Sequence, residues 1–339
     1  MKLSPELLDE LRTTTRRALR AAAGDVIEEL DLAGLLVDTG SGGSGLGERE
    51  MVLVANELGS ALSPSAFLPT AVIASTFLSH ADTAAAADLL AAVVGGTSRC
   101  AVALAGADTT AVEATSTADG EWSVSGSTAA LISPSQSDVL LTVASTGDGA
   151  ALFAVAIEHA GVTPADQLDS DRGLVDVTLV QSPARQLASP TATATGSAAA
   201  YRRSLLAVAG EQVGVARACL ETAVEYAKTR TQFGSPIGSY QAIKHRCTDV
   251  LLNIELADSV VAQAADGGAL DDAELAFVVA ARAAVVAAES CIHIHGGIGF
   301  TWEHSAHRYL RRAQVNASLL GPSALHRNAI AVSAGLTGA

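Results

Sequence analysis

The sequence predicts an α+β fold in which an N-terminal helical domain, a central small β-barrel and a C-terminal four-helix bundle follow one another. Three observations support this prediction. Apolar residues recur at helical spacing near both ends of the chain, short runs rich in Val, Thr and Ser fill its middle, and 49% of the 339 residues are apolar while only 4% are aromatic. A core of Ala, Val and Leu suits closely packed helices, and a chain of this length has room for two or three modules.

The N-terminal helical domain is expected to cover residues 1–96. Leucines recur at helical spacing in the first twenty residues, and a further helix is predicted from Glu48 to Leu58. The segment Ser60–Pro64 then breaks the helical pattern.

The central barrel is expected to cover residues 97–190. Short runs rich in Val, Thr and Ser alternate there with clusters of Gly, Asp and Ser, which is the pattern of a small β-barrel or sandwich. The runs are Cys100–Leu104, Trp122–Val124, Val139–Val143 and Ala151–Ile157. The Thr, Ser and Ala residues from Ser189 to Ser197 are typical of a linker.

Residues 198–339 are expected to form the C-terminal bundle. Helical periodicity returns in this part, and each predicted helix carries a face of Ala, Val and Leu. The predicted helices are Arg202–Thr229, Gln241–Ala265 and Asp271–His295.

The chain is acidic, with 21 basic and 36 acidic residues and a formal net charge of -15. Nucleic acid is therefore not an expected partner, and a polyphosphate site would have to be a local positive feature. The first residues lack the pattern of a secretion signal. The longest apolar stretch, Leu275 to Ala288, is interrupted by Arg282 and is too short to span a bilayer. We expect a cytoplasmic protein without a membrane segment.

The spacing of cysteine and histidine residues does not favour a metal site. The four cysteines lie far apart, which favours reduced, buried thiols over a disulfide framework or zinc ligands. They are Cys100, Cys219, Cys247 and Cys291. Four imidazoles within fifteen positions could ligate a metal, namely those of His293, His295, His304 and His307. The first two are two residues apart near a predicted helix end, so their side chains diverge by about 200°, and no bound metal is expected.

A glycine-rich segment, Gly40–Gly45, has the glycine spacing of a dinucleotide-binding turn, follows the apolar Leu35–Val37 and precedes a predicted helix. That motif also needs alternating strands and helices and an acidic residue about 20 positions later. The chain instead continues into helices, with apolar residues where the acid should be. We therefore expect a flexible turn between helices.

Two further segments, some sixty residues apart, have features of a cofactor site. Arg230–Gly234 follows the first predicted helix of the bundle, and an Arg beside amide, hydroxyl and aromatic side chains can clamp a diphosphate and pack a ring system. His295–Thr301 ends the third predicted helix with three glycines, which let the backbone approach a ligand closely. Either segment alone is also compatible with an ordinary turn between helices.

Together the two segments resemble the acyl-CoA dehydrogenase family. That family carries an Arg-x-Gln-Phe-Gly turn and a Gln-x-x-Gly-Gly-x-Gly segment in its C-terminal domain, followed by a basic helix like Arg308–Ala313. The resemblance covers nearly the whole chain. Leu32–Gly47 is similar to the family's apolar and then Gly-rich N-terminal stretch, and Ala55–Gly59 is similar to its following helix.

The resemblance implies FAD-dependent α,β-dehydrogenation of an acyl-CoA thioester, in which a carboxylate takes the α-proton and the flavin accepts the β-hydride. In this family each flavin lies at a dimer interface. One subunit gives the barrel and the base, and its neighbour gives the two motif segments. The residues that match this donated half are Arg230 for the diphosphate, Gln232 and Phe233 beside the cofactor, His293 in place of the usual Gln, and Gly296 and Gly297 for backbone approach.

The other half of the family's site is incomplete in this sequence. Leu320 occupies the place of the usual glutamate base, and Ser204 occupies the alternative base position early in the long helix. Neither side chain is a base at pH 7. Glu211 lies on a similar helix face but about 10 Å further along the axis. The aromatic residue that normally lies beside the flavin in the barrel is missing from Leu131–Ser133, and no catalytic residue is assigned to this chain.

These losses suggest that the chain is the non-catalytic partner in a heteromeric acyl-CoA dehydrogenase and completes the FAD site of a homologous chain. It resembles the short subunits of actinobacterial α2β2 enzymes that act on bulky CoA thioesters such as steroid side chains. The expected partners are the homologous subunit, an acyl-CoA substrate and an electron-transfer flavoprotein or similar acceptor. Two alternatives stay open: a self-sufficient homotetramer with an unrecognised base, and a scaffold that binds neither flavin nor thioester.

Overall fold

The structure is a computed structural model that describes residues 3–21, 25–102, 112–116, 119–132 and 137–336. The chain forms two compact units, of which one contains residues 1–51 and 64–204 and the other contains residues 52–63 and 205–339. The boundary falls inside two helices, α3 (Glu48–Ser60) and α6 (Pro190–Thr229). The division into three domains at 1–96, 97–190 and 198–339 stays a prediction.

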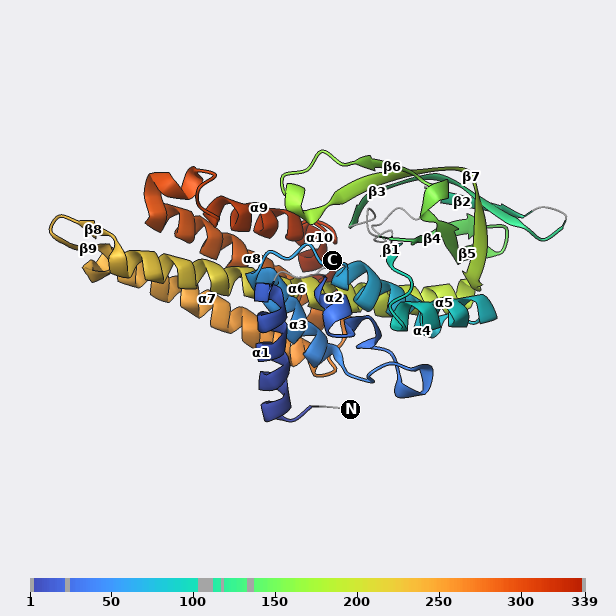
Figure 1. Ribbon diagram of the computed structural model, residues 1–339, viewed down its shortest axis with the longest axis horizontal. Coiled ribbons are helices and arrows are strands. Elements are labelled where there is room, and N and C mark those ends of the chain that lie inside the picture. Colours follow the sequence, from blue (N-terminus) through green and yellow to red (C-terminus); the bar gives the residue numbers. More distant parts are fainter. Residues whose placement is uncertain (1–2, 22–24, 103–111, 117–118, 133–136, 337–339) are drawn as a thin grey trace. The chain divides into compact units, whose positions relative to one another are not determined.

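Short helices make up the N-terminal part of the first unit, as the leucine spacing predicts (Figure 1). Asp25 and Thr83 cap two of them, since each side chain accepts a backbone N–H of the following turn at 3.2 Å. The predicted break at Ser60–Pro64 is confirmed by the end of α3 at Ser60. The remaining elements are α1 (Pro5–Ala21), α2 (Val26–Glu29), η1 (Leu32–Gly34), η2 (Thr39–Ser41), the π-helical η3 (Phe67–Ala74), α4 (Ser75–His80) and α5 (Ala84–Val94).

The glycine-rich segment forms a turn, as expected, and this turn is closely packed. Gly43 and Gly45 donate their N–H groups to the carbonyl oxygens of Asp38 and Val37, at 3.1 and 2.8 Å. A Cβ at Gly43 would lie 2.2 Å from the oxygen of Val37, so only glycine fits there. Because these amides are used inside the turn, they do not form a phosphate cradle.

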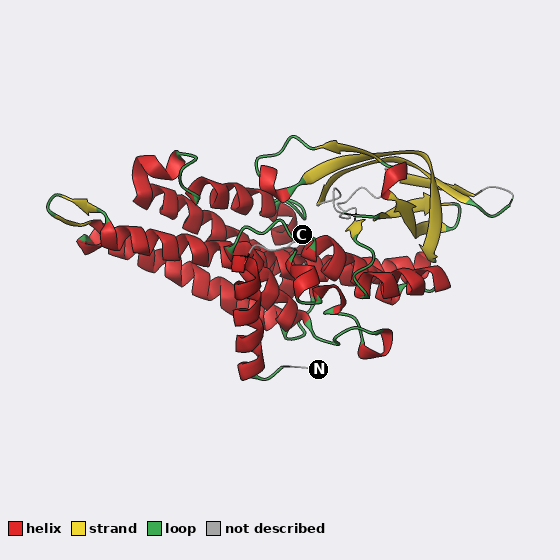
Figure 2. Cartoon of the chain, viewed as in Figure 1, coloured by secondary structure: helices red, strands yellow, loops and turns green. Residues whose placement is uncertain are grey.

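The central strands of the first unit close into a small barrel, shown in yellow in Figure 2. The ring runs β4, β2, β3, β7, β5 and back to β4, while β1 adds to β4 and β6 adds to β7. Fully buried residues such as Phe153 and Val124 fill it, and Trp122 packs on Phe153 with ring centroids 5.2 Å apart. The strands are β1 (Cys100–Val102), β2 (Val112–Ser116), β3 (Trp122–Ile132), β4 (Val139–Thr146), β5 (Gly149–Ala156), β6 (Gly161–Pro164) and β7 (Leu174–Ala188).

The barrel region is predicted in part. The four predicted runs coincide with β1, β3, β4 and β5, whereas β2, β6 and β7 are additional strands. Leu131 and Ile132 are the last residues of β3. Ser133 lies outside the described residues.

The predicted linker from Ser189 to Ser197 is wrong, because α6 begins at Pro190 and not near Arg202. Proline is well placed in the first turn of a helix, where its missing N–H is not needed. Asp82 accepts hydrogen bonds from the backbone N–H and the hydroxyl of Ser189, at 2.9 and 2.5 Å. Thr193 accepts the N–H of Leu152 at 2.9 Å. Contacts with residues distant in sequence therefore hold a stretch that has no apolar face of its own.

The second unit is the predicted C-terminal helical bundle. Besides the last part of α6, it contains α7 (Gln241–Ala265), α8 (Leu270–His295), α9 (Ala306–Asn316) and α10 (Ser323–Ser333). The predicted bounds of the second helix are confirmed, and the third helix begins one residue earlier than predicted. Buried alanines form most of the inner face of α8, as the composition suggests.

Glycines let the end of α3 cross α6 at very short range. A Cβ at Gly214 would lie 1.9 Å from the carbonyl oxygen of Asn56, and a Cβ at Gly59 would lie 2.0 Å from that of Glu211. The hydroxyl of Ser60 also donates to the carbonyl of Gly214 at 3.1 Å. Backbone therefore packs on backbone at this crossing.

One helical stretch in the described part of the chain, Leu270–Phe300, is long and apolar enough to cross a membrane by length and composition. It is longer than the apolar stretch noted in the sequence, because α8 continues into a further helical turn. Most of it is buried inside the structure, and core helices of soluble proteins pass the same test.

Candidate functional site

One end of the helical bundle brings together the two segments that the motifs single out. The chain turns at this end between α6 and α7, and α8 runs back to finish there at His295. Tyr226, in the last turn of α6, stacks on His295 with ring centroids 4.4 Å apart. Figure 1 shows the β8–β9 turn at the same end of the bundle.

The first segment is a short hairpin, here called the Arg230 hairpin (residues 230–236). β8 (Thr231–Gln232) pairs with β9 (Ser235–Pro236). The N–H of Ile237 donates to the carbonyl of Arg230 at 2.8 Å. The hydroxyl of Tyr240 donates to the carbonyl of Gln232 at 3.1 Å. Backbone groups and the Tyr240 hydroxyl thus hold the hairpin.

The side chains of Arg230, Gln232 and Phe233 are exposed. Phe233 is 93% exposed and has a left-handed backbone with φ of 51°, which is uncommon for a bulky residue. Gly234 follows with φ of 80°. An exposed phenyl ring on a tightly turned backbone indicates a contact made with another molecule.

The second segment, here called the Gly296 turn, is η9 (Gly296–Phe300). Gly296 has a positive φ of 65°, and the space around a Cβ at Gly296 or Gly297 is open to 4 Å. Gly299 is different, since a Cβ there would lie 3.1 Å from the carbonyl of Ile292. The first two glycines therefore offer open backbone for a ligand, and the third is needed for packing.

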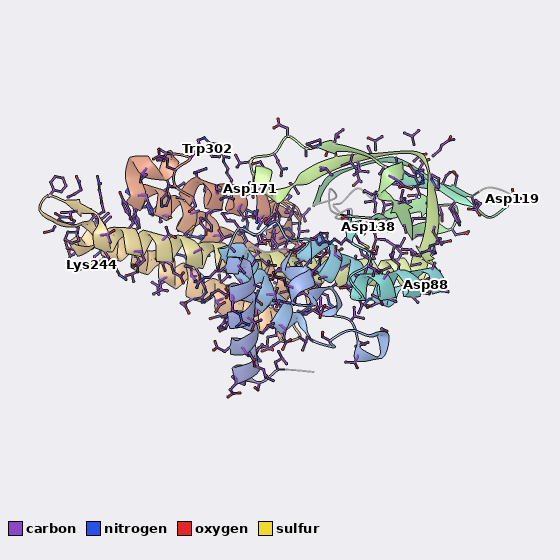
Figure 3. All side chains as sticks on the ribbon, viewed as in Figure 1. Asp88, Asp119, Asp138, Asp171, Lys244 and Trp302 are labelled. Atoms are coloured by element: carbon purple, nitrogen blue, oxygen red, sulfur yellow. The ribbon has the colours of Figure 1, made fainter. Side chains whose placement is uncertain are left out.

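Exposed aromatic residues continue from this turn toward α9. Phe300 is 73% and Trp302 is 77% exposed. Figure 3 labels Trp302 beyond the end of α8. Arg311 lies over the Trp302 ring at 4.7 Å, and His307 meets that ring edge-on with centroids 4.7 Å apart. Trp302 is thus exposed and yet held in place.

His293 and His295 point in different directions, as their spacing predicts. His293 is exposed, whereas His295 is buried. Nδ1 of His295 lies 2.8 Å from the carbonyl oxygen of Cys291. No group of three or more His, Cys, Asp or Glu side chains in the described ranges is arranged to hold a metal ion.

Three aromatic rings stack where α6 and α8 end, and we call Tyr226, His295 and His304 the ring stack. The His295 ring also contacts His304, with centroids 4.1 Å apart. Burial, together with the neighbouring imidazoles of His295 and His307, lowers the pKa of His304 below its usual 6.5. The sequence presents these histidines as possible metal ligands, and the structure uses them for packing.

The two residues that the resemblance places at base positions, Leu320 and Ser204, carry no carboxylate. Leu320 is buried, and the buried Ser204 donates its hydroxyl to the carbonyl of Ala200 at 2.7 Å. Glu211 is also buried, and its Oε1 lies 3.0 Å from Nη1 of Arg312. A carboxylate tied to a guanidinium in this way is a structural group and a poor general base.

A buried acid–imidazole pair, which the sequence pattern does not reveal, lies next to the Leu320 segment. Nδ1 of His326 is 3.7 Å from Oε1 of Glu274, and the His326 ring packs on Phe277 with centroids 4.8 Å apart. A Cβ at Gly321 would lie 3.6 Å from Nε2 of His326. Burial raises the pKa of Glu274, while His326 opposes that shift. The pair joins α8 to α10.

Comparison with known proteins agrees with this geometry. Residues 197–335 match the family model for the acyl-CoA dehydrogenase C-terminal domain. A solved structure of the "Tcur3481-Tcur3483 steroid ACAD" is 27% identical, with a TM-score of 0.85 over 97% of this chain and 98% of that chain. The C-terminal part of the chain, residues 197–335, is thus similar to the C-terminal domain of the acyl-CoA dehydrogenase family. The Arg230 hairpin and the Gly296 turn both lie within these matched residues.

Two further proteins are similar to this chain, one over about a third of its length and one over nearly all of it. "Acyl-CoA dehydrogenase IpdE2" of Mycobacterium tuberculosis is 48% identical over 113 residues, which are 33% of this chain and 36% of that protein. The match thus spans about a third of the length of this curated relative. The ChsE4-ChsE5 complex from Mycobacterium tuberculosis shares the fold, with a TM-score of 0.85, 24% identity and 99% coverage of each chain.

Proposed function

We propose that this chain is the subunit of a heteromeric, flavin-dependent acyl-CoA dehydrogenase that lacks its own base and completes the FAD site of a homologous subunit in an α2β2 complex. The observation that carries the proposal is a contrast within the second unit. Phe233 on the Arg230 hairpin is 93% exposed, while an apolar, buried Leu320 stands where the family's glutamate would be. The chain thus keeps the residues that serve a neighbour's flavin and has lost the one that would serve its own.

The exposed residues fit FAD held by another chain. The Arg230 guanidinium can form two parallel hydrogen bonds with the diphosphate. Phe233 can pack on the cofactor's rings, and Gln232 can donate from its amide. The open space at Gly296 and Gly297 allows backbone to approach the cofactor.

His293 stands where the family usually has glutamine, and its exposed imidazole can still donate one hydrogen bond. When bound, FAD would supply the acceptor for the β-hydride. The α-proton would go to a carboxylate of the homologous subunit. This chain's part is to bind and orient the cofactor.

We further propose that the complex acts on a bulky CoA thioester of the steroid side-chain type and passes electrons to an electron-transfer flavoprotein or similar acceptor. Two of the similar solved structures support this: one is named as a steroid enzyme, and both are named for two chains. The second relevant fact is the 48% identity with an acyl-CoA dehydrogenase over 113 residues.

The test is to purify the chain alone and co-expressed with a homologous chain that has glutamate at the position of Leu320. The visible spectrum gives the flavin content, and native mass gives the stoichiometry. Dye reduction with a steroid side-chain CoA thioester gives the activity. We expect FAD and activity only in the complex, with one flavin per pair of unlike chains.

A lone chain that binds a full complement of FAD and turns over would contradict the proposal and require a base elsewhere, as in a homotetramer. A complex that forms but carries no flavin would favour the scaffold alternative. In that case Arg230→Gln would leave the complex unchanged.

A further inference from the structure

We infer that the ring stack of Tyr226, His295 and His304 fixes the spacing between the Arg230 hairpin and the Gly296 turn, and that His295 is the positioning residue at its centre. This inference rests on the proposed function, since it gives the stack a role in cofactor binding. His295 would act through the backbone of the two segments and would not touch FAD itself.

The stack joins the two segments at their bases. Tyr226 lies one helical turn before Arg230, and its carbonyl accepts the Arg230 N–H at 2.9 Å. His295 is the residue immediately before Gly296. The planes of these two rings are 29° apart, and their centroids are separated by 4.4 Å. A shift of either helix end would therefore have to break this stacked contact.

His304 extends the stack to the start of α9. Its ring is 4.1 Å from that of His295, with an interplanar angle of 42°. Nδ1 of His304 also accepts the N–H of Ala306, in the first turn of α9, at 3.1 Å. The chain leaves the Gly296 turn and returns to the stack after only a few residues, so both ends of that turn are held.

Hydrogen bonding fixes which ring nitrogen of His295 carries a proton. Because a carbonyl only accepts, Nδ1 must carry the proton that it shares with Cys291. Nε2 is buried and has no hydrogen-bond partner among the described residues. The ring also faces Tyr226 from α6 and His304, with His307 of α9 next to His304.

This arrangement differs from ordinary core packing. The inner face of α8 is made mostly of small alanines, whereas its last residue inserts a ring between rings from two other elements. Stacked rings have restricted geometry and therefore specify a distance better than aliphatic side chains do. Such a restriction is useful where two ligand-contacting segments must keep a set separation.

The first experiment needs no flavin and uses the chain alone. Amide hydrogen exchange is measured in wild type, His295→Leu and His295→Phe. We expect His295→Leu to speed exchange at least fivefold at both Ile237, in the Arg230 hairpin's hydrogen bond, and Thr301, at the end of the Gly296 turn. His295→Phe keeps a ring and should leave both rates within twofold. If His295→Leu speeds exchange at Thr301 but not at Ile237, the inference that the ring stack links the two segments is wrong.

A matched variant controls for general loss of stability. Val261→Ala opens a small cavity near the opposite end of α7, where Val261 is buried. We expect it to lower thermal stability without selective faster exchange at Ile237 and Thr301. Tyr226→Leu removes the other side of the stack and should reproduce the His295→Leu pattern. If Val261→Ala also speeds exchange selectively at Ile237 and Thr301, the ring stack is not what protects these two amides.

The second experiment tests the link to the cofactor in the purified complex with the homologous subunit. FAD is removed and titrated back, and binding is followed by flavin fluorescence. We expect His295→Leu to weaken FAD binding at least tenfold and His295→Phe to stay within twofold. Unchanged FAD affinity in His295→Leu would overturn the inference while leaving the proposed function intact. A wild-type complex that never binds FAD would instead contradict the proposed function, and the exchange rates would still decide whether the stack couples the segments.

Discussion

The carboxylate of Glu211 and the guanidinium of Arg312 form a buried ion pair in which Oε1 and Nη1 are 3.0 Å apart. The pair ties α6 to α9 within the second unit, close to the crossing of α3 and α6. Glu211 is the carboxylate nearest in sequence to the alternative base position at Ser204. Because its carboxylate is tied to Arg312, we expect Glu211 to stabilise the fold and not to accept a proton from a substrate.

Replacing Glu211 with glutamine should therefore reduce the stability of the fold without abolishing the dehydrogenase activity of the complex. Glu211→Gln removes a charged partner of the buried Arg312, and we expect the free energy of unfolding in urea to fall by about 1.5 to 3 kcal/mol. Glu225→Gln is the matched control, because the Glu225–Lys228 pair is on the surface and should cost well under 1 kcal/mol. A Glu211→Gln complex that keeps its stability and FAD but loses all dehydrogenase activity would identify Glu211 as the base.

Substitutions in the exposed Arg230 hairpin should instead weaken FAD binding and leave the stability of the fold unchanged. Phe233→Ala and Arg230→Gln change exposed side chains, and the edge-on contact of Phe233 with Tyr240, at 6.5 Å between ring centroids, lies on the surface. The melting temperature of the lone chain should therefore stay within about 2 °C. In the complex with the homologous subunit, each variant should weaken FAD binding tenfold or more. Flavin content after gel filtration measures this. A large fall in the melting temperature of the lone chain would show that the hairpin is part of the fold.

Two glycine substitutions likewise distinguish a residue needed for helix packing from one that is proposed to lie beside the cofactor. Gly214→Ala places a methyl group 1.9 Å from the Asn56 carbonyl oxygen. The helices must then move apart, at a cost of about 3 kcal/mol or more. Gly297→Ala adds its methyl group in open space and should change stability by less than about 1 kcal/mol. The second variant should nevertheless weaken FAD binding in the complex. Urea unfolding and FAD titration of both variants test the pair, and equal stability of the two would contradict the close helix crossing.

Much of the bundle could be predicted because its signals are local. An Ala, Val and Leu face runs along each helix, and Gln241 and Ala265 bound α7 as the periodicity indicates. The start of α6 could not be predicted in this way. Its first turns are rich in Thr and Ala, and they are held by Asp82 and by β5, which are distant in sequence. Tertiary contacts override weak local preference there.

The candidate site was predictable only where a motif is continuous in sequence. Arg230–Gly234 and Gly296–Gly299 are each continuous in sequence, so the resemblance that the two carry together can be recognised from the sequence. The ring stack is different, because Tyr226 lies about seventy residues before His295 in the chain. The Glu274–His326 pair is equally remote in sequence. Such contacts become visible only when helix packing brings their members together.

The four cysteines should differ in reactivity according to burial. Cys247 is partly exposed, whereas Cys100, Cys219 and Cys291 are buried. Burial raises the pKa of Cys100 to about 12, so its thiol is protonated at ordinary pH and shielded from reagents. We expect iodoacetamide at pH 8 to modify the lone folded chain at Cys247 and nowhere else until urea is added. Peptide mass spectrometry locates the label, and Cys247→Ser is the control. Rapid labelling of Cys291 in the folded chain would contradict the packing around His295.

Stability should also fall in acid through His304. Burial and the neighbouring imidazoles of His295 and His307 lower its pKa below the usual 6.5, so the unfolded chain binds this proton at a higher pH than the folded chain does. Stability then rises with pH in the interval between the lowered pKa and about 6.5 and is fully present above it. His304→Phe keeps a ring in the stack but cannot titrate. Urea unfolding of wild type and His304→Phe is compared from pH 7.5 to pH 5. As the pH falls, the free energy of unfolding should decrease more steeply in wild type, and the difference between the two slopes should correspond to at most one proton. Identical slopes would mean that His304 takes up its proton equally well in both states, which is incompatible with an imidazole buried against His295.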